Sequence, residues 1–142
     1  MTNNAVLMSI RPQYAYKIFD GTKTVELRRI KPKTLSNGDL ILVYVSSPVK
    51  SLVGAFKVAH VIEKPLSSLW KAVKDHAGVS YAEFSKYYDG VLSGAAIFIK
   101  DVWLLPKPIH LSDLQKGVNG FYPPQSFRYT SIQQVNNFRQ LQ

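Results

Sequence analysis

The sequence around residue 25 reads Gly21-Thr22-Lys23-Thr24-Val25-Glu26-Leu27-Arg28-Arg29, a turn followed by a strand with charges at alternating positions. Side chains alternate between the two faces of a strand. We therefore expect Val25 and Leu27 to point one way, and Thr24, Glu26 and Arg28 to point the other way. A lysine at the turn, an acid and then an arginine on one face favour a site that binds an anion.

The basic residues are concentrated around this stretch. The chain carries 18 lysines and arginines against nine acids, a formal charge of +9. A basic surface of this size attracts nucleic acid or acidic lipid headgroups. The alternative is a solvated basic face that only keeps the protein soluble. More than half of the excess lies between residues 11 and 37, in Arg11, Lys17, Lys23, Arg28, Arg29, Lys31 and Lys33, against Asp20 and Glu26.

Length and composition limit the class of protein. A chain of 142 residues fits one domain, which we place over residues 1–142. The absence of cysteine excludes disulfides and thiol nucleophiles, and His60, His76 and His110 share no spacing typical of a metal site. Neither metal nor other cofactor is expected, and His60 is predicted to be a buried histidine with its polar atoms satisfied. The apolar run that follows the polar first four residues is too short for a signal peptide or a membrane span, so we expect a cytosolic protein with no membrane partner.

The pattern of apolar residues, prolines and glycines predicts an α+β protein. Gly54 inside one strand indicates a bulge or a close backbone approach, and Pro106 and Pro108 are expected to end the longest strand. Curved strands and uneven helices favour a small mixed β-barrel with flanking helices over a doubly wound sheet. Strands are predicted at 5–10, 24–29, 40–45, 52–62 and 94–105, an extended segment at 120–129, and helices from Pro12, Pro65, Ser80, Ser112 and Ser131.

Several motifs together resemble the activating signal cointegrator homology (ASCH) domain family. They are the Gly-x-Lys-x-x-Glu-x-Arg core at 21–28, Ser9-Ile10-Arg11-Pro12, Gly38-Asp39, the helix with Tyr81, Phe84 and Tyr88, and Pro123-Pro124-Gln125-Ser126-Phe127-Arg128-Tyr129. The last of these looks like the prokaryotic and phage branch described as predicted transcriptional regulators.

The resemblance implies a fold and a function. The fold is a barrel like that of pseudouridine synthase and archaeosine transglycosylase (PUA) domains, with a cleft associated with RNA binding. Some members look to be nucleases that use a lysine at the position of Lys23 with a hydroxyl from the C-terminal segment. Others remove an acyl group from modified cytidine with that lysine, a threonine and a glutamate. Here Glu26 stands at the threonine position.

The candidate residues allow either binding or catalysis. Like charge from Arg28 and Arg29 is expected to lower the pKa of Lys23 and make it a base or nucleophile, whereas Glu26 opposes this. The pattern favours a phosphate clamp over catalysis. Ser126 could supply a hydroxyl beside Arg128 or bond its own backbone in a turn. The predicted nucleic-acid contacts are Arg11, Tyr16, Lys23, Arg28, Arg29, Arg128 and Tyr129, and the catalytic residues of an enzyme would be Lys23, Glu26 and Ser126.

Three functions remain open at this point. The first is binding of RNA or single-stranded nucleic acid through a basic cleft, with a regulatory role. The second is an enzyme in the same cleft, either a metal-independent ribonuclease or a hydrolase of a modified nucleoside that uses Lys23. The third is a protein-interaction module of a transcriptional complex. The sequence leaves the oligomeric state open.

Overall fold

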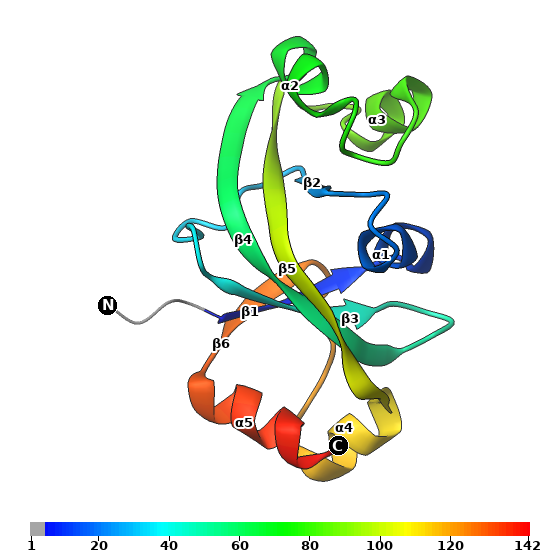
Figure 1. Cartoon of the computed structure of the whole chain (residues 1–142), viewed down its shortest axis with the longest axis vertical. Coiled ribbons are helices and arrows are strands. Elements are labelled where there is room, and N and C mark those ends of the chain that lie inside the picture. Colours follow the sequence, from blue (N-terminus) through cyan, green and yellow to red (C-terminus); the bar gives the residue numbers. More distant parts are fainter. Residues whose placement is uncertain (1–4) are drawn as a thin grey trace.

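The computed structural model describes residues 5–142, which form one curved sheet with helices at both ends and on one side (Figure 1). The α+β class expected from the sequence is confirmed. The strands are β1 (Ala5–Ile10), β2 (Val25–Arg28), β3 (Leu40–Val45), β4 (Ser51–Pro65), β5 (Ser93–His110) and β6 (Phe127–Thr130). The helices are α1 (Pro12–Phe19), α2 (Leu66–Val73), α3 (Tyr81–Tyr87), α4 (Leu111–Gly117) and α5 (Ile132–Gln140).

The sheet is mixed and open. Its strand order is β2-β5-β4-β3-β1-β6, in which β1 and β3 are parallel and every other pair is antiparallel. The apolar strand β3 lies inside the sheet, as expected. The prediction of a closed barrel is wrong, because β2 and β6 pair with one neighbour each and remain the two edges. The four-residue β2 pairs only with β5, so no backbone ladder joins the edges.

The long pair β4 and β5 gives the sheet its curvature. Three register shifts interrupt their ladder, one of them at Gly54. A Cβ at Gly54 would lie 2.4 Å from the Trp103 carbonyl oxygen, which confirms the expected close approach. β5 does not end at Pro106 and Pro108 but continues to His110. The prolines are tolerated because they fall in the stretch between Leu104 and residue 109 that has no partner in β4.

Local capping signals locate the helix starts. Ser80 and Glu83 form the expected capping box of α3, and the Ser131 side chain accepts a hydrogen bond from the Gln134 backbone at the start of α5. The prediction for α4 is corrected by two residues: His110, not Ser112, is its N-cap. The Nδ1 atom of the His110 ring accepts from the Ser112 backbone N–H at 3.1 Å.

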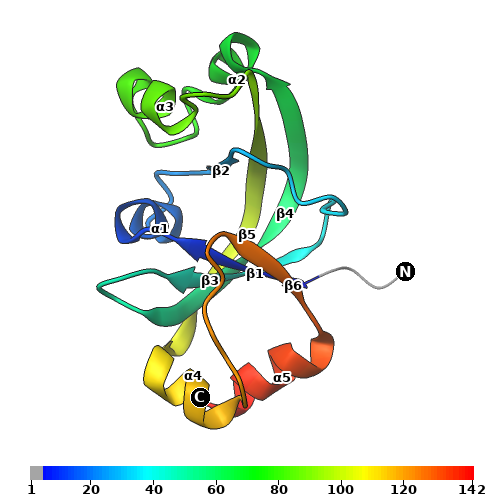
Figure 2. The same ribbon diagram turned by 180° about the vertical axis from the view of Figure 1, so that it is seen from behind.

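Three groups of buried side chains hold the elements together. One lies between the sheet and α1 and includes Met8 and Val43, and a second lies on the other face beneath α4 and α5. The third lies between β2, β5, α2 and α3. Figure 2 shows α2 and α3 at one end of the molecule and α4 and α5 at the other. His60 is in none of them; it is exposed and stacks on Phe98, so the prediction of a core histidine is wrong.

Candidate functional site

Strand β2 separates an apolar face from a polar one. Val25 and Leu27 are buried in the group beneath α2 and α3, whereas Glu26 and Arg28 line a cleft of about 710 Å³. This is the alternation that the sequence predicts. The other walls of the cleft come from the start of α1, from α3 and from Gln125 and Ser126 ahead of β6. Three segments distant in sequence therefore meet around β2.

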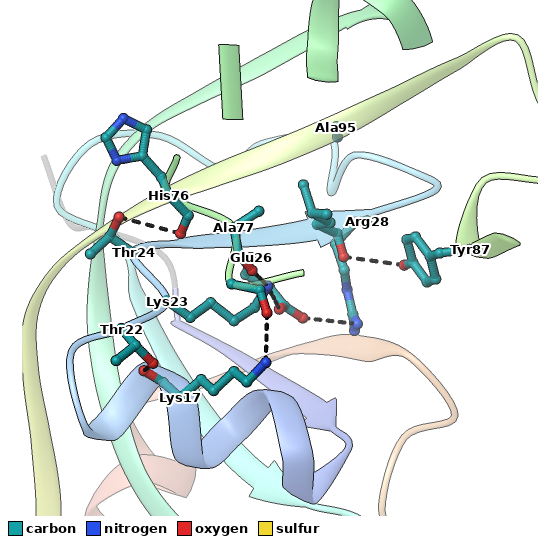
Figure 3. Close-up of polar contacts among 12 residues, drawn as sticks. Lys17, Thr22, Lys23, Thr24, Glu26, Arg28, His76, Ala77, Tyr87 and Ala95 are labelled. Carbon is teal, nitrogen blue, oxygen red and sulfur yellow. Dashed lines mark hydrogen bonds and ion pairs between the residues drawn. The ribbon is translucent and has the colours of Figure 1, made fainter. Parts of the chain in front are cut away.

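The floor of the cleft is a chain of charged groups: Lys23, Glu26 and Arg28, here called the floor. The Lys23 Nζ and Glu26 Oε1 atoms are 4.0 Å apart, and the Arg28 Nη1 atom donates to Glu26 Oε2 at 3.3 Å (Figure 3). Lys23 is only 2% exposed and Glu26 4%. The predicted convergence of the three side chains is confirmed, but two of them are nearly enclosed by protein.

Lys23 is held by the loop between α2 and α3. Its ammonium donates to the Ala77 carbonyl at 2.6 Å and lies 5.4 Å from the centre of the Tyr14 ring. Burial is the main cause that lowers the pKa of Lys23, and Lys17 lowers it further, while Glu26 acts in the opposite direction. The direction agrees with the sequence prediction. The cause does not, because removal from water outweighs like charge and the neighbouring cation is Lys17.

Two further contacts fix the same loop against α1 and the start of β2. The Lys17 ammonium donates to the Gly78 carbonyl at 2.7 Å (Figure 3). The Thr24 backbone N–H donates to the His76 carbonyl at 2.8 Å. With Lys23, three donors hold three successive carbonyls, from His76 to Gly78. The loop that leads into α3 is thereby fixed as a wall of the cleft.

Arg28 joins the two edges of the open sheet. From the end of β2, its Nη2 atom donates to the Ser126 carbonyl at 2.8 Å, to the Ser126 hydroxyl at 3.3 Å and to the Ser9 carbonyl at 3.4 Å. Ser9 belongs to β1 and Ser126 precedes β6. The Arg28 Nε atom is buried and has no hydrogen-bond partner among the described residues. In a closed barrel, backbone hydrogen bonds would join the two edges of the sheet. Here the side chain of Arg28 connects β2 to β1 and to the segment before β6.

The accessible cations lie on the rim. Arg11, at the start of α1, and Lys86, on α3, line the cleft from different walls, and both are exposed. Within residues 5–142, neither side chain makes a hydrogen bond or an ion pair. Arg29 also lines the cleft, but its Nη1 atom donates to the Tyr87 and Asp89 carbonyls at 3.0 and 2.9 Å. Arg11 and Lys86, here called the rim cations, are therefore free for a ligand.

Three residues predicted from the sequence lie outside this cleft. Arg128 does not line the cleft, and its guanidinium lies 4.5 Å from the centre of the Tyr122 ring. Tyr16 is half exposed on α1 but is not among the lining residues. The Tyr129 hydroxyl accepts from the Thr34 backbone N–H at 3.0 Å, which ties β6 to the loop after β2.

A second hollow of about 320 Å³ continues the cleft. Both hollows are lined by Ser9, Ser46 and Gln125, so they share a wall. The second one adds Tyr44, whose pKa is raised by burial, and the exposed Lys50. Sequence reasoning missed this hollow, although a polar Ser-Ser-Pro turn directly after the buried strand β3 was a signal for it.

Within residues 5–142 there is no helix long and apolar enough to cross a membrane, and no group of three or more side chains arranged to ligate a metal. The two adjoining hollows gather the candidate binding and catalytic groups. Their groups are a buried carboxylate, a partly buried arginine, hydroxyls from Tyr44 and Ser126, and cations accessible at the rim and at Lys50.

Known proteins resemble this chain in sequence and fold. An ASCH domain-containing ribonuclease of Zymomonas mobilis is 29% identical over 123 residues, which are 87% of this chain and 82% of the relative. The crystal structure of ASCH from Zymomonas mobilis superposes with a TM-score of 0.89 at 27% identity, covering 96% of this chain and 94% of that one. Human THYN1, in complex with 5-methylcytosine containing DNA, has the same fold, with a TM-score of 0.63 at 12% identity, covering 98% and 97%.

The family assignment rests on more than half of the chain. The model of the ASCH domain matches residues 8–102, which hold β2 to β4, parts of β1 and β5, all of the floor and the rim cations. The fold and the motif around Lys23 agree with that match, and the PUA-like superfamily fits the curved mixed sheet. The chain belongs to the ASCH domain family.

Proposed function

We propose that this protein binds single-stranded RNA in the cleft over β2. The observation that carries the proposal is the pair of free cations, Arg11 and Lys86, on different walls of a cleft whose floor holds a buried carboxylate and a partly buried arginine. Phosphates of a strand would contact the rim, where the cations have no protein partner. The cleft of about 710 Å³ would hold an unpaired base of that strand above the floor.

The overall charge supports a polyanionic ligand. The chain carries +9, and the described residues hold only two ion pairs, both of which involve Glu26. Most of the positive charge is therefore left for ligands or solvent. A regulatory role, a modified nucleoside as ligand and a cytoplasmic location stay predictions from the sequence.

Salt dependence tests the binding proposal. We expect fluorescence anisotropy to detect binding of a fluorescein-labelled RNA octanucleotide to the protein at low salt. The affinity should fall steeply as the salt concentration increases, because counterions are released on binding. Lys86→Ala should reduce the slope of log affinity against log salt by about one unit. Lys107→Ala is the matched control, since Lys107 is exposed on β5 outside both hollows. An affinity insensitive to salt would contradict phosphate binding and favour a nucleoside ligand.

A ribonuclease activity is the second candidate, and two observations favour it. The relative from Zymomonas mobilis, similar over most of its length, is named a ribonuclease. In this chain the hydroxyl of Ser126 lies beside Arg28 in the cleft, and Lys50 and Tyr44 line the adjoining hollow. Cleavage by the RNA 2′-hydroxyl requires a base, an acid and a cation near the phosphate.

The two lysines differ in access, which decides their proposed roles. Lys23 is 2% exposed and its ammonium is bound to the Ala77 carbonyl, so it positions the floor and the loop. Lys50 is exposed at the second hollow, so it can approach a phosphate or a leaving oxygen. In an active enzyme, Lys50→Ala should reduce single-turnover cleavage by about 100-fold or more and leave affinity within a few-fold.

The cleavage assay uses a labelled single-stranded RNA with protein in excess, in the presence of EDTA. Ser126→Ala and Lys50→Ala are compared with Lys107→Ala, which is expected to match the unmodified protein. Lys23→Met is expected to act mainly through affinity and stability. Equal loss of cleavage and affinity in Lys50→Ala would contradict its role in the reaction, and no cleavage by the unmodified protein would leave binding as the function.

A further inference from the structure

The exposed side chain of Tyr122 lies next to the second hollow, and the Arg128 guanidinium packs over its ring. Tyr122 is 64% exposed, and the Arg128 guanidinium lies 4.5 Å from the centre of its ring. The Arg128 Nη1 atom also donates to the Tyr122 carbonyl at 2.5 Å, and the buried Phe121 ring lies 5.3 Å from the guanidinium. The position of Arg128 over the tyrosine is therefore fixed by several contacts.

This pair continues the line of the two hollows. Tyr122 is followed directly by Pro123 and Pro124, which line the second hollow, and then by Gln125, which lines both hollows. The segment holds its place because the Ser9 hydroxyl donates to the Pro124 carbonyl at 2.6 Å. A surface with a nucleotide-sized cleft, an adjoining hollow and an open ring is thus arranged along one short stretch of chain.

We propose that Tyr122 and Arg128 form a stacking site for a base of single-stranded RNA that leaves the cleft through the second hollow. This inference rests on the proposed function and specifies its substrate class: an oligonucleotide, not a mononucleotide or nucleoside. Lys50 lies on the path and meets the phosphates between the cleft and the stacking site.

The chemistry of the pair fits a nucleotide. An arginine over a ring covers one of its two faces and leaves the other for a base, and every base has a face that stacks. The guanidinium itself supplies a cation to the phosphate backbone close to the stacked base. The second hollow is also lined by three serines, Tyr44 and Leu111, and Lys50 is the one charged residue among its described lining residues, so a polyanion is favoured over a neutral ligand.

Probe length tests the inference. Affinity for a dinucleotide and for an octanucleotide of the same base composition is measured by competition with a labelled RNA. Tyr122→Ala should reduce the affinity for the octanucleotide by about tenfold, the loss typical of one stacked base. The affinity for the dinucleotide should change by less than about twofold. Tyr122→Phe should restore the octanucleotide affinity. Tyr81→Ala is the matched control, because Tyr81 is 62% exposed and lines neither hollow.

A second measurement uses the unmodified protein. 2-Aminopurine placed at successive positions of the octanucleotide should show one position, outside the cleft, whose fluorescence is quenched on binding and recovers in Tyr122→Ala. Equal losses on both probes, no loss on either, or no such position would overturn the stacking site while leaving RNA binding intact. Failure of the unmodified protein to bind either probe would overturn the proposed function itself and the stacking site with it.

Discussion

The floor and the rim of the cleft carry the same types of residue but in opposite states. On the floor, Lys23 is 2% exposed and bound to a carbonyl, and the Arg28 Nη2 atom donates to β1 and to the segment before β6. On the rim, Arg11 and Lys86 are exposed without a partner in the described chain. A buried cation with fixed partners positions other groups, whereas an exposed cation without partners can exchange water for phosphate.

The comparison teaches that a basic motif does not itself identify the binding cations. The Lys-x-x-Glu-x-Arg stretch is the most conspicuous motif of the sequence, yet its charges mostly satisfy one another and the surrounding backbone. Its contribution is to shape the cleft, because Arg28 holds the two sheet edges and Lys23 holds the loop before α3. The predictions below separate these two kinds of charge.

The largest effect is expected from Arg28→Ala. The substitution leaves the Glu26 carboxylate buried with only Lys23 at 4.0 Å, and it removes the side-chain contact between β2 and the segment before β6. Breaking a buried pair by removing one partner costs about 3–5 kcal/mol. Urea denaturation should show a loss of that size in the free energy of unfolding. A loss of unfolding free energy below about 1 kcal/mol would show that Arg28 contributes no more to stability than an exposed cation.

A smaller loss is expected from Lys23→Met. Methionine keeps the apolar length of the side chain but leaves the Ala77 carbonyl without its donor, which costs about 1–3 kcal/mol. The loop before α3 should then exchange its amide hydrogens faster, which hydrogen exchange by mass spectrometry can measure. Unchanged exchange in residues 76–80 would show that the ammonium does not hold this wall.

Substitutions at the rim should separate binding from stability. Arg11→Ala and Lys86→Ala are each expected to change the free energy of unfolding by no more than about 0.5 kcal/mol, because neither side chain has a partner in the described structure. Each should nevertheless weaken RNA binding and lower the salt slope by about one unit. A rim variant that destabilises the fold and leaves the salt slope unchanged would reverse the distinction drawn between rim and floor.

The smallest effect concerns pH. Burial lowers the pKa of Lys23 in the folded protein below its ordinary value of 10.5, so the unfolded chain keeps its proton to higher pH. In the window between the folded pKa and 10.5, the unfolded state binds more protons, and the contribution of Lys23 to stability rises with pH. Lys23→Met should therefore cost more near pH 10 than at pH 7, and parallel stability profiles of the two proteins would contradict this.

Structural features that depend only on residues close together in the sequence could be predicted. The alternation in β2 and the capping box at Ser80 follow from strand and helix geometry within a few residues. The continuation of β5 through Pro106 was not predictable. It is possible because the residues around Pro106 have no partner in β4, and this gap depends on how the two strands pair. The open sheet was also missed, since closure depends on whether β2 meets β6.

The sequence by itself determined which charges lie on one face of β2, because the two-residue period of a strand needs no other part of the chain. Only the tertiary structure decided which of those charges are free. The Arg28 partner Ser126 is 98 positions away and the Lys23 partner Ala77 is 54 away. Such contacts depend on how separate segments pack, and burial then sets access and pKa. The same packing joins the two hollows and places Tyr122 beyond them, which no local pattern encodes.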